Sequence, residues 1–170
     1  MVQLSKGASA SVGALFVVQV AMSNHARNRG NLITKISTFD LNTSQERSAA
    51  FRLIALDCLR GARVLHANSA NSSGEYILTA HALELAFKAF LAKFGVSDSQ
   101  LEGRAFRHNL AKLHEESCKL VLSISAAGAQ ANVQWLGKYH SAPLRYEYDS
   151  SLPACDVFFE IVESIVEESR

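Results

Sequence analysis

The sequence predicts an all-α protein, folded as an antiparallel up-and-down bundle of four to five helices. Apolar side chains recur every three or four residues along several long stretches, which is the spacing of one face of a helix. Ahead of some of these stretches, Ser or Thr stands three residues before Glu or Gln, as it does at a helix N-terminus. After residue 40, no stretch alternates apolar and polar residues in the manner of a half-buried strand.

The composition is that of one domain with a hydrophobic core. The chain has 170 residues, of which 48% are hydrophobic, and both values are typical of a globular domain. Its 17 basic and 16 acidic side chains give a net charge of +1. The chain as a whole therefore does not attract nucleic acid or a membrane surface, and an anionic partner must be bound by a local group of side chains. We assign residues 40–170 to this domain.

The first 39 residues form a leader whose role the sequence leaves open. Residues 12–22 are apolar and follow Lys6, so they are similar to the hydrophobic region of a signal peptide, but they lack a small-x-small cleavage site. The run is too short to span a bilayer. We expect a leader that pairs loosely with the domain, or translation from an upstream start site, and secretion is the alternative.

The three cysteines predict a cytoplasmic protein. Cys58, Cys118 and Cys155 are odd in number and far apart, and each lies among apolar neighbours in a helical stretch. They form no CxxC pair of the kind that binds zinc or exchanges disulfides. We therefore expect reduced, buried thiols that act as small hydrophobic side chains.

The first helix is predicted from Ser48 to about residue 67. Thr43 and Glu46 have the spacing of a capping box just before it. The stretch places seven apolar or small side chains on one face: Phe51, Ile54, Ala55, Cys58, Leu59, Ala62 and Leu65. Residues 68–73 are polar and predict a turn to the next helix.

The second helix, residues 76–95, has the strongest helical pattern in the chain. Ser72 and Glu75 offer a second capping box before it, and Gly95 is well placed to end it. Six of its side chains form one apolar stripe: Tyr76, Ala80, Leu83, Phe87, Phe90 and Phe94.

Shorter helices are predicted in the rest of the chain. Ser97 and Gln100 form a third capping box at a short turn of helix, and a longer helix is expected at residues 109–124. A further short helix at residues 132–140 must end before Pro143. Pro153 fits the first turn of a last helix, residues 154–168.

His81, Glu84 and Lys88 form a polar row beside the apolar stripe of the second helix. Ionisable groups in this place are costly to bury without partners, so they are candidates for a functional cluster. The alternative is an i, i+4 salt bridge between Glu84 and Lys88 beside a histidine satisfied by neighbouring helices. The spacing of His81 and Glu84 also occurs in di-iron bundles. Such a site needs four carboxylates and a second Glu/His pair from another helix, and only His108, His114 with Glu115 and Glu116, and His140 remain to supply one. We therefore expect no metal and no cofactor.

Two basic segments are candidates for binding phosphate. Arg104, Arg107 and His108 precede the helix that Asn109 opens, where free backbone amides favour an anion, although an exposed basic turn is the alternative. Arg145 and Tyr146 lie in the segment PLRYEY. An arginine among tyrosines can stack on a base and pair with a phosphate, but tyrosines that pack a loop onto the bundle are equally compatible with the pattern.

Three segments in this order resemble the HEPN superfamily of small helical bundles. They are AHALELAFKAFLAKFG, RHNLAKLHEES and LGKYHSAPLRYEY, and the likeness covers roughly residues 44–170. The resemblance implies a HEPN-like bundle that often forms a homodimer. Many relatives act in toxin–antitoxin or defence systems as RNases that need no metal.

The resemblance also implies a set of site residues. In those RNases an arginine and a histidine separated by four to six residues meet at the dimer cleft. Here Arg104 and His108 are separated by three residues, whereas Arg60 and His66 have the expected spacing but lie in the first helix. The resemblance thus favours His108 as acid or base and Arg104 or Arg107 as the phosphate clamp. The remaining candidates are binding residues: His81, Glu84, Lys88, Arg145 and Tyr146.

Together these patterns predict a domain that binds RNA or a nucleotide and leave endoribonuclease activity open, because the arginine–histidine spacing departs from that of the RNases. One alternative is a non-catalytic module that pairs with a nucleotidyltransferase-like protein. The other is a metal-dependent bundle enzyme. The sequence predicts neither a membrane partner nor a cofactor.

Overall fold

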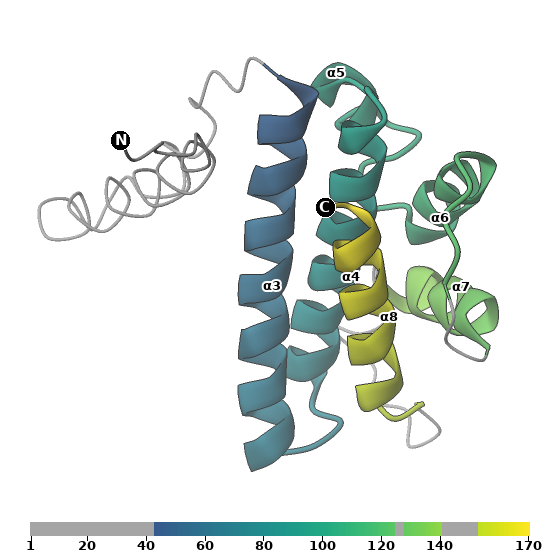
Figure 1. The fold of residues 1–170 in the computed structure, drawn as a ribbon. Coiled ribbons are helices and arrows are strands. Elements are labelled where there is room, and N and C mark those ends of the chain that lie inside the picture. The colour runs from purple at the N-terminus through teal and green to yellow at the C-terminus, as the bar shows by residue number, and fades with distance from the viewer. Residues whose placement is uncertain (1–42, 125–127, 141–152) are drawn as a thin grey trace, which may run out of the picture. The chain divides into compact units, whose positions relative to one another are not determined.

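A computed structural model describes residues 43–124, 128–140 and 153–170, all within the unit Leu41–Arg170, and the regular structure of these residues is entirely helical (Figure 1). This confirms the predicted all-α class. The predicted leader, residues 1–39, lies outside the described residues. The described residues form these helices: α3 (Ser44–Asn68), α4 (Ser73–Lys93), α5 (Asp98–Leu101), α6 (Leu110–Lys119), α7 (Ala129–His140) and α8 (Asp156–Glu168).

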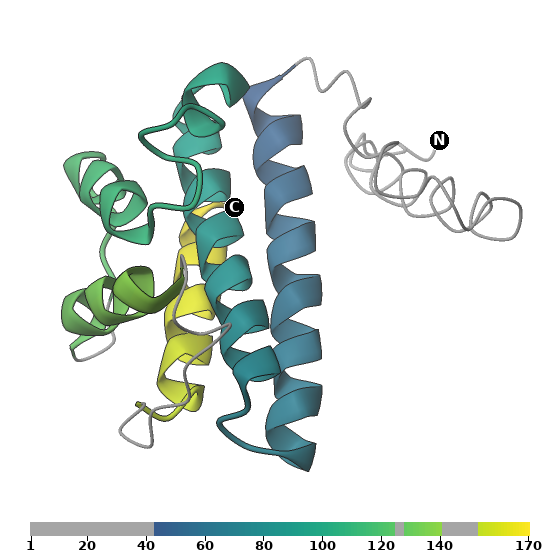
Figure 2. The ribbon, with the colours of Figure 1, turned by 180° about the vertical axis from the view of Figure 1, so that it is seen from behind.

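Helices α3 and α4 form a long antiparallel pair. The predicted capping box is present at the start of α3, where Thr43 and Glu46 bond each other's backbone amides. The turn after α3 includes Asn71 in the left-handed region (φ 62°), which asparagine tolerates better than most residues. The chain then reverses, and α4 runs back along α3 (Figures 1 and 2).

Helix α4 is the centre of the fold. It packs against α3, α6, α7 and α8, so its buried positions extend beyond the predicted stripe. Five of the six stripe residues are buried, but Phe94 is exposed because α4 has already ended at Lys93. Gly95 (φ 86°) follows, and the amides of Gly95 and Val96 bond back to the carbonyls of Ala92 and Leu91. This Schellman motif confirms Gly95 as the residue that closes the helix.

Helices α6 and α7 pack on the side of α4 that faces away from α3 (Figures 1 and 2). Helix α6 is shorter than predicted and ends at Lys119. Val121 takes a left-handed conformation (φ 67°), and the Leu122 amide bonds back to the Ser117 carbonyl. Leu122 is buried, so the helix stops early to turn this apolar side chain into the core. No pattern of glycine or proline in the sequence marks this end.

The contact between α6 and α7 is close at Gly137. A Cβ added there would lie 3.3 Å from the Leu110 Cβ and 3.5 Å from the Ala111 amide nitrogen. Those two residues belong to the first turn of α6, so the missing side chain of Gly137 lets the two helices approach each other. His140, at the end of α7, is thereby brought towards the segment that precedes α6.

Helix α8 runs parallel to α4. The Tyr76 hydroxyl at the start of α4 donates to the Pro153 carbonyl just before α8, and Lys93 at the end of α4 donates to the Glu168 carbonyl at the end of α8 (2.8 Å). Helix α8 therefore runs in the same direction as α4 and opposite to α3. Helices α6 and α7 are about half as long as α4 and pack on its side, so the chain returns to the start of α4 before α8 begins.

One predicted capping box forms only in part. Ser72 accepts a hydrogen bond from the Glu75 amide, as predicted. The Glu75 carboxylate does not return a bond to Ser72; it accepts the Asn71 amide (2.6 Å) and contacts His66 (2.7 Å). By contrast, the box of Ser97 and Gln100 is complete at α5. No helix in the described ranges is long and apolar enough to cross a membrane.

Candidate functional site

The candidate site is centred on Glu84, a buried carboxylate in the middle of α4. Only 2% of this residue is exposed, because α4 is covered by other helices on most sides. A carboxylate in this position is strongly destabilising unless several donors surround it. Its partners therefore define the site.

Three side chains approach the Glu84 carboxylate. Lys88, one turn further along α4, donates from Nζ to Oε1 (2.6 Å). His108, in the segment before α6, places Nδ1 3.0 Å from Oε2, and His140, at the end of α7, places Nε2 3.4 Å from the same oxygen. The two imidazole rings meet edge to face with their centroids 6.2 Å apart. We call Glu84, Lys88, His108 and His140 the carboxylate cluster.

The donors keep Glu84 ionised. Burial by itself would raise the pKa of this carboxyl, but hydrogen bonds from His140, Lys88 and His108, with the charge of Lys88, outweigh burial and lower the pKa to about 2. The cluster therefore contains a fixed negative charge at neutral pH.

His81 lies next to the carboxylate cluster and is half-buried. Burial lowers its pKa; the charge of Glu84 partly opposes this effect, and His140, Lys88 and His108 add to it. His81 is therefore biased towards its neutral form. It contributes a polar surface at the edge of the cluster and no additional charge.

The members of the cluster differ in their access to solvent. The His108 side chain is 59% exposed, whereas those of His140 and Lys88 are each 11% exposed. His108 thus has one ring nitrogen against a buried carboxylate while most of the ring faces solvent. A small anion or a polynucleotide can reach this ring without any movement of the helices.

The structure brings together four of the predicted site residues: His81, Glu84, Lys88 and His108. Arg104 and Arg107 lie on the segment between α5 and α6, and both are exposed. Within the described residues no ion pair or hydrogen bond is recorded for either guanidinium group, so both are available to an external anion. Arg145 and Tyr146 lie outside the described residues.

His140 is the cluster member that the sequence indicated only as a possible partner in a di-iron ligand set and that is absent from the predicted site residues. It follows the buried Val133 and Leu136 at spacings of three and four residues, so the apolar stripe of α7 points at it. A histidine that continues the buried stripe of a short amphipathic helix is the signal that could have identified it.

The other arginine–histidine pair with the expected spacing is separated in the structure. Arg60 forms an exposed ion pair with Asp57 on the outside of α3 (2.8 Å). His66 instead contacts the buried Glu75 (2.7 Å). The two side chains therefore take part in different interactions, and neither belongs to the carboxylate cluster.

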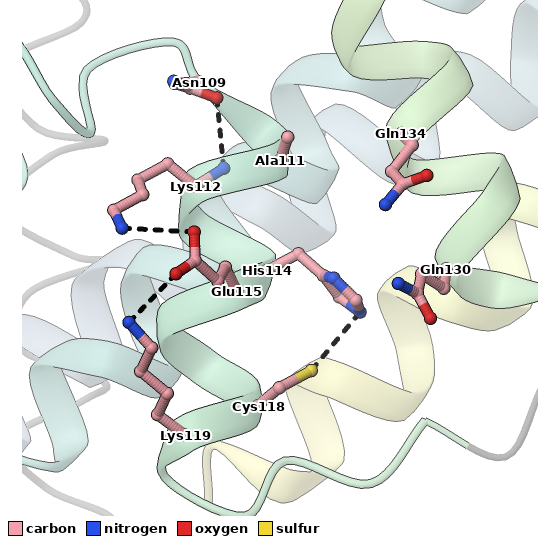
Figure 3. Close-up of a pocket in the computed structure, with 9 residues that line it drawn as sticks. All are labelled: Asn109, Ala111, Lys112, His114, Glu115, Cys118, Lys119, Gln130 and Gln134. Carbon is pink, nitrogen blue, oxygen red and sulfur yellow. Dashed lines mark hydrogen bonds and ion pairs between the residues drawn. The ribbon is translucent and has the colours of Figure 1, made fainter.

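A hollow of about 540 Å³ lies between α6 and α7, and no member of the carboxylate cluster lines it (Figure 3). Inside it, the Cys118 Sγ lies 3.5 Å from the His114 Nε2, and Gln130 and Gln134 of α7 face this pair (Figure 3). Cys118 is exposed, so the prediction of a buried thiol is wrong there. The pKa of Cys118 is raised and that of His114 is lowered, each by partial burial, so the pair favours a neutral thiol beside a neutral imidazole.

The carboxylate cluster is also the place where the described residues could hold a cation. One ligand atom each from Glu84, His108 and His140 lies within 4.8 Å of the others. Two imidazole nitrogens and one carboxylate oxygen are a donor set that zinc sites use.

Comparisons of this chain with protein-family models, with curated proteins and with solved structures give no match.

Proposed function

We propose that this protein binds single-stranded RNA at the carboxylate cluster and cleaves it without a metal ion. The observation that supports this most directly is the state of His108, whose ring is held by a buried carboxylate and yet is 59% exposed. A carboxylate behind an imidazole fixes its tautomer and orientation, as in hydrolytic enzymes that use histidine as the general base.

The proposal gives each nitrogen of His108 a role. Nδ1 faces the Glu84 carboxylate, so Nδ1 carries the proton and Nε2 is left with a lone pair. In the proposed reaction Nε2 takes the proton of a ribose 2′-hydroxyl, and the 2′-oxygen attacks the adjacent phosphorus. The bond from phosphorus to the 5′-oxygen breaks, and this oxygen leaves with a proton from water. The products are a 2′,3′-cyclic phosphate and a 5′-hydroxyl.

Basic side chains near His108 fit the charge of the substrate. Arg107 is adjacent to His108 in the chain, and Arg104 precedes it by four positions. Both are exposed, and guanidinium groups bind phosphate oxygens through paired hydrogen bonds. In the proposal they stabilise the negative charge that develops on the phosphate. Arg145 and Tyr146 are proposed to extend the binding surface.

The resemblance to the HEPN superfamily supports the same proposal. Relatives with that bundle include RNases of toxin–antitoxin and defence systems, and a homodimer is part of the proposal on this ground. The spacing of Arg104 and His108 departs from that of the RNases. In the proposal, Glu84 orients His108 in this protein.

Cleavage of a labelled single-stranded RNA in the presence of EDTA tests this function. We expect cleavage of the RNA and none of the DNA of the same sequence, because DNA lacks the 2′-hydroxyl. Replacing His108 by Ala should lower the rate about 10²-fold to 10⁴-fold. His114→Ala is the matched control, because His114 lies on α6 outside the cluster and should keep the rate. An unchanged rate in His108→Ala would remove His108 from the mechanism.

A second candidate is a non-catalytic module that pairs with a nucleotidyltransferase-like protein. The outer face of α3 favours it, because Leu53 and Val64 are exposed there by 46% and 58% and lie about three turns apart on one face. The ion pair of Asp57 and Arg60 lies between them. On this reading the protein leaves RNA intact and binds a purified partner of that class. Leu53→Lys should then weaken the complex, and RNA cleavage that depends on His108 would contradict the candidate.

A further inference from the structure

We propose that Glu84, His108 and His140 form a binding site for a divalent transition-metal ion of the zinc class. The three ligand atoms are Oε2 of Glu84, Nδ1 of His108 and Nε2 of His140, and all lie within 4.8 Å of one another. They come from α4, from the segment before α6 and from the end of α7, so folding alone brings them together. This site does not rest on the proposed RNase activity.

The distances are close to those of a tetrahedral site. Oε2 of Glu84 lies 3.0 Å from Nδ1 of His108 and 3.4 Å from Nε2 of His140. Zinc bonds of about 2.0–2.1 Å place adjacent ligand atoms about 3.3–3.4 Å apart in a tetrahedron. A metal ion would take the place of the protons that now link the two rings to the carboxylate. The two imidazole nitrogens lie within 4.8 Å of each other, and in the proposed site the two rings adjust around Glu84.

The donor set selects the class of metal. Two imidazole nitrogens suit zinc and its transition-metal neighbours, whereas magnesium and calcium prefer oxygen ligands throughout. Three protein ligands leave a fourth position of the tetrahedron for water or for an oxygen of a bound anion. The exposure of His108 gives that position a route to solvent.

Lys88 opposes the binding of a cation and so lowers the affinity of the proposed metal site. Its ammonium group occupies Oε1 of Glu84 at 2.6 Å, so the carboxylate is limited to one oxygen as a metal ligand. The positive charge of Lys88 also repels an incoming divalent ion. We therefore expect a weaker site than a dedicated structural zinc centre, and one that becomes stronger when Lys88 is replaced by a neutral side chain.

A bound metal would block the proposed general base. With zinc on Nδ1 of His108, Nε2 carries the ring proton and has no lone pair with which to accept another. Zinc should therefore inhibit RNA cleavage, and this consequence alone rests on the proposed function. The cluster would therefore have two exclusive states. In one, Nε2 of His108 is free to accept a proton, and in the other, the cluster holds a metal ion.

Calorimetric titration of the full chain with zinc chloride, in the absence of RNA, tests the site. We expect one zinc ion per chain at the cluster, at least tenfold weaker binding in His108→Ala and in His140→Ala, and tighter binding in Lys88→Met. Cobalt titration should give the visible spectrum of a tetrahedral site in the unmodified protein and lose it in His140→Ala. Circular dichroism establishes that each variant is folded.

Cys118→Ser is the matched control. It removes a thiol that lies next to His114 and outside the cluster, so zinc binding at the cluster should be unchanged. Equal zinc affinity in the folded His140→Ala variant, or loss of binding in Cys118→Ser, would overturn the proposed site. Because the titration contains no RNA, zinc binding without cleavage would reject only the RNase proposal. Cleavage dependent on His108 without zinc binding would reject only the metal site.

Discussion

Helix α4 buries two glutamates, Glu75 in its first turn and Glu84 near its middle, and their carboxylates have different kinds of partner. Glu75 accepts the backbone amide of Asn71, in the turn that joins α3 to α4, and contacts His66, in the last turn of α3. Glu84 is surrounded by side chains that include His108 and His140, 24 and 56 positions away in the chain.

The difference separates a structural carboxylate from a functional one. Glu75 is fully buried, and it accepts the Asn71 amide of the turn between α3 and α4. Its other partners are His66, whose side chain is 35% exposed, and the Cys155 thiol just before α8. Glu84 instead orients a histidine that is 59% exposed. We interpret the carboxylate that accepts a nearby backbone amide as part of the fold, and the ionised carboxylate that positions a well-exposed imidazole as available for chemistry.

The largest expected effect is on RNA cleavage. Glu84→Gln keeps the size of the side chain but removes the negative charge that orients His108, and we expect a loss of about 10²-fold to 10⁴-fold in rate. Glu75→Gln makes the same chemical change outside the cluster and should leave the rate of the folded protein unchanged. Equal losses in the two variants would contradict the functional distinction between these glutamates.

Removal of the Glu75 side chain should instead affect stability. Glu75→Ala leaves the Asn71 amide and His66 without their acceptor, and we expect the free energy of unfolding to fall by about 2–4 kcal/mol. Urea unfolding followed by circular dichroism measures this change. A decrease below about 0.5 kcal/mol would show that the turn does not depend on this carboxylate.

The pH dependence of stability should reveal the state of Glu84. Its pKa is about 2 in the folded protein, against an ordinary value of 4.5. The stabilisation is present above the unfolded pKa of 4.5 and is lost as the pH falls towards 2. It is on the order of 3 kcal/mol. Unfolding measured between pH 6 and pH 2 should therefore be less steeply dependent on pH in Glu84→Gln, and an identical slope would argue against an ionised Glu84.

His81 should give a smaller effect at higher pH. Its pKa is lowered from 6.5 chiefly by burial, so the unfolded chain binds a proton more readily than the folded one. Stability should decrease as the pH falls below 6.5. His81→Gln removes this contribution, and unfolding measured at pH 7.5 and pH 5.5 should then differ less than in the unmodified protein. A larger difference in the variant would contradict the expected effect, because it would mean that His81 stabilises the protein as the pH falls.

Local patterns predicted most of the fold. The apolar spacing of α4, the capping pairs at Thr43 and Ser97 and the closing Gly95 depend on residues a few positions apart, so the sequence displays them directly. The early end of α6 does not have such a signal, because it depends on the buried position of Leu122 in the assembled core. The parallel course of α8 depends likewise on how α6 and α7 pack.

The candidate site likewise combines residues that local patterns indicate with residues that only tertiary packing brings into place. Glu84 and Lys88 are one turn apart on a helix, and His108 was singled out by its basic neighbours, so these residues could be found in the sequence. The place of His140 depends on the packing of α7 against α6, which no short motif encodes. The burial of Glu75 was missed for a related reason, because its position in a capping pattern provided a simpler local interpretation.

The close approach of α7 to α6 at Gly137 gives a way to change the position of His140 relative to Glu84. A single methyl group at position 137 must displace α6 or α7 by a few tenths of an ångström, because the added carbon would lie 3.3 Å from the Leu110 Cβ. His140 lies three residues further along the same helix and would move with α7, while Glu84 and Lys88 stay on α4. Progressively larger side chains at position 137 would thus vary the spacing of one imidazole in small steps, with every polar group of the cluster retained.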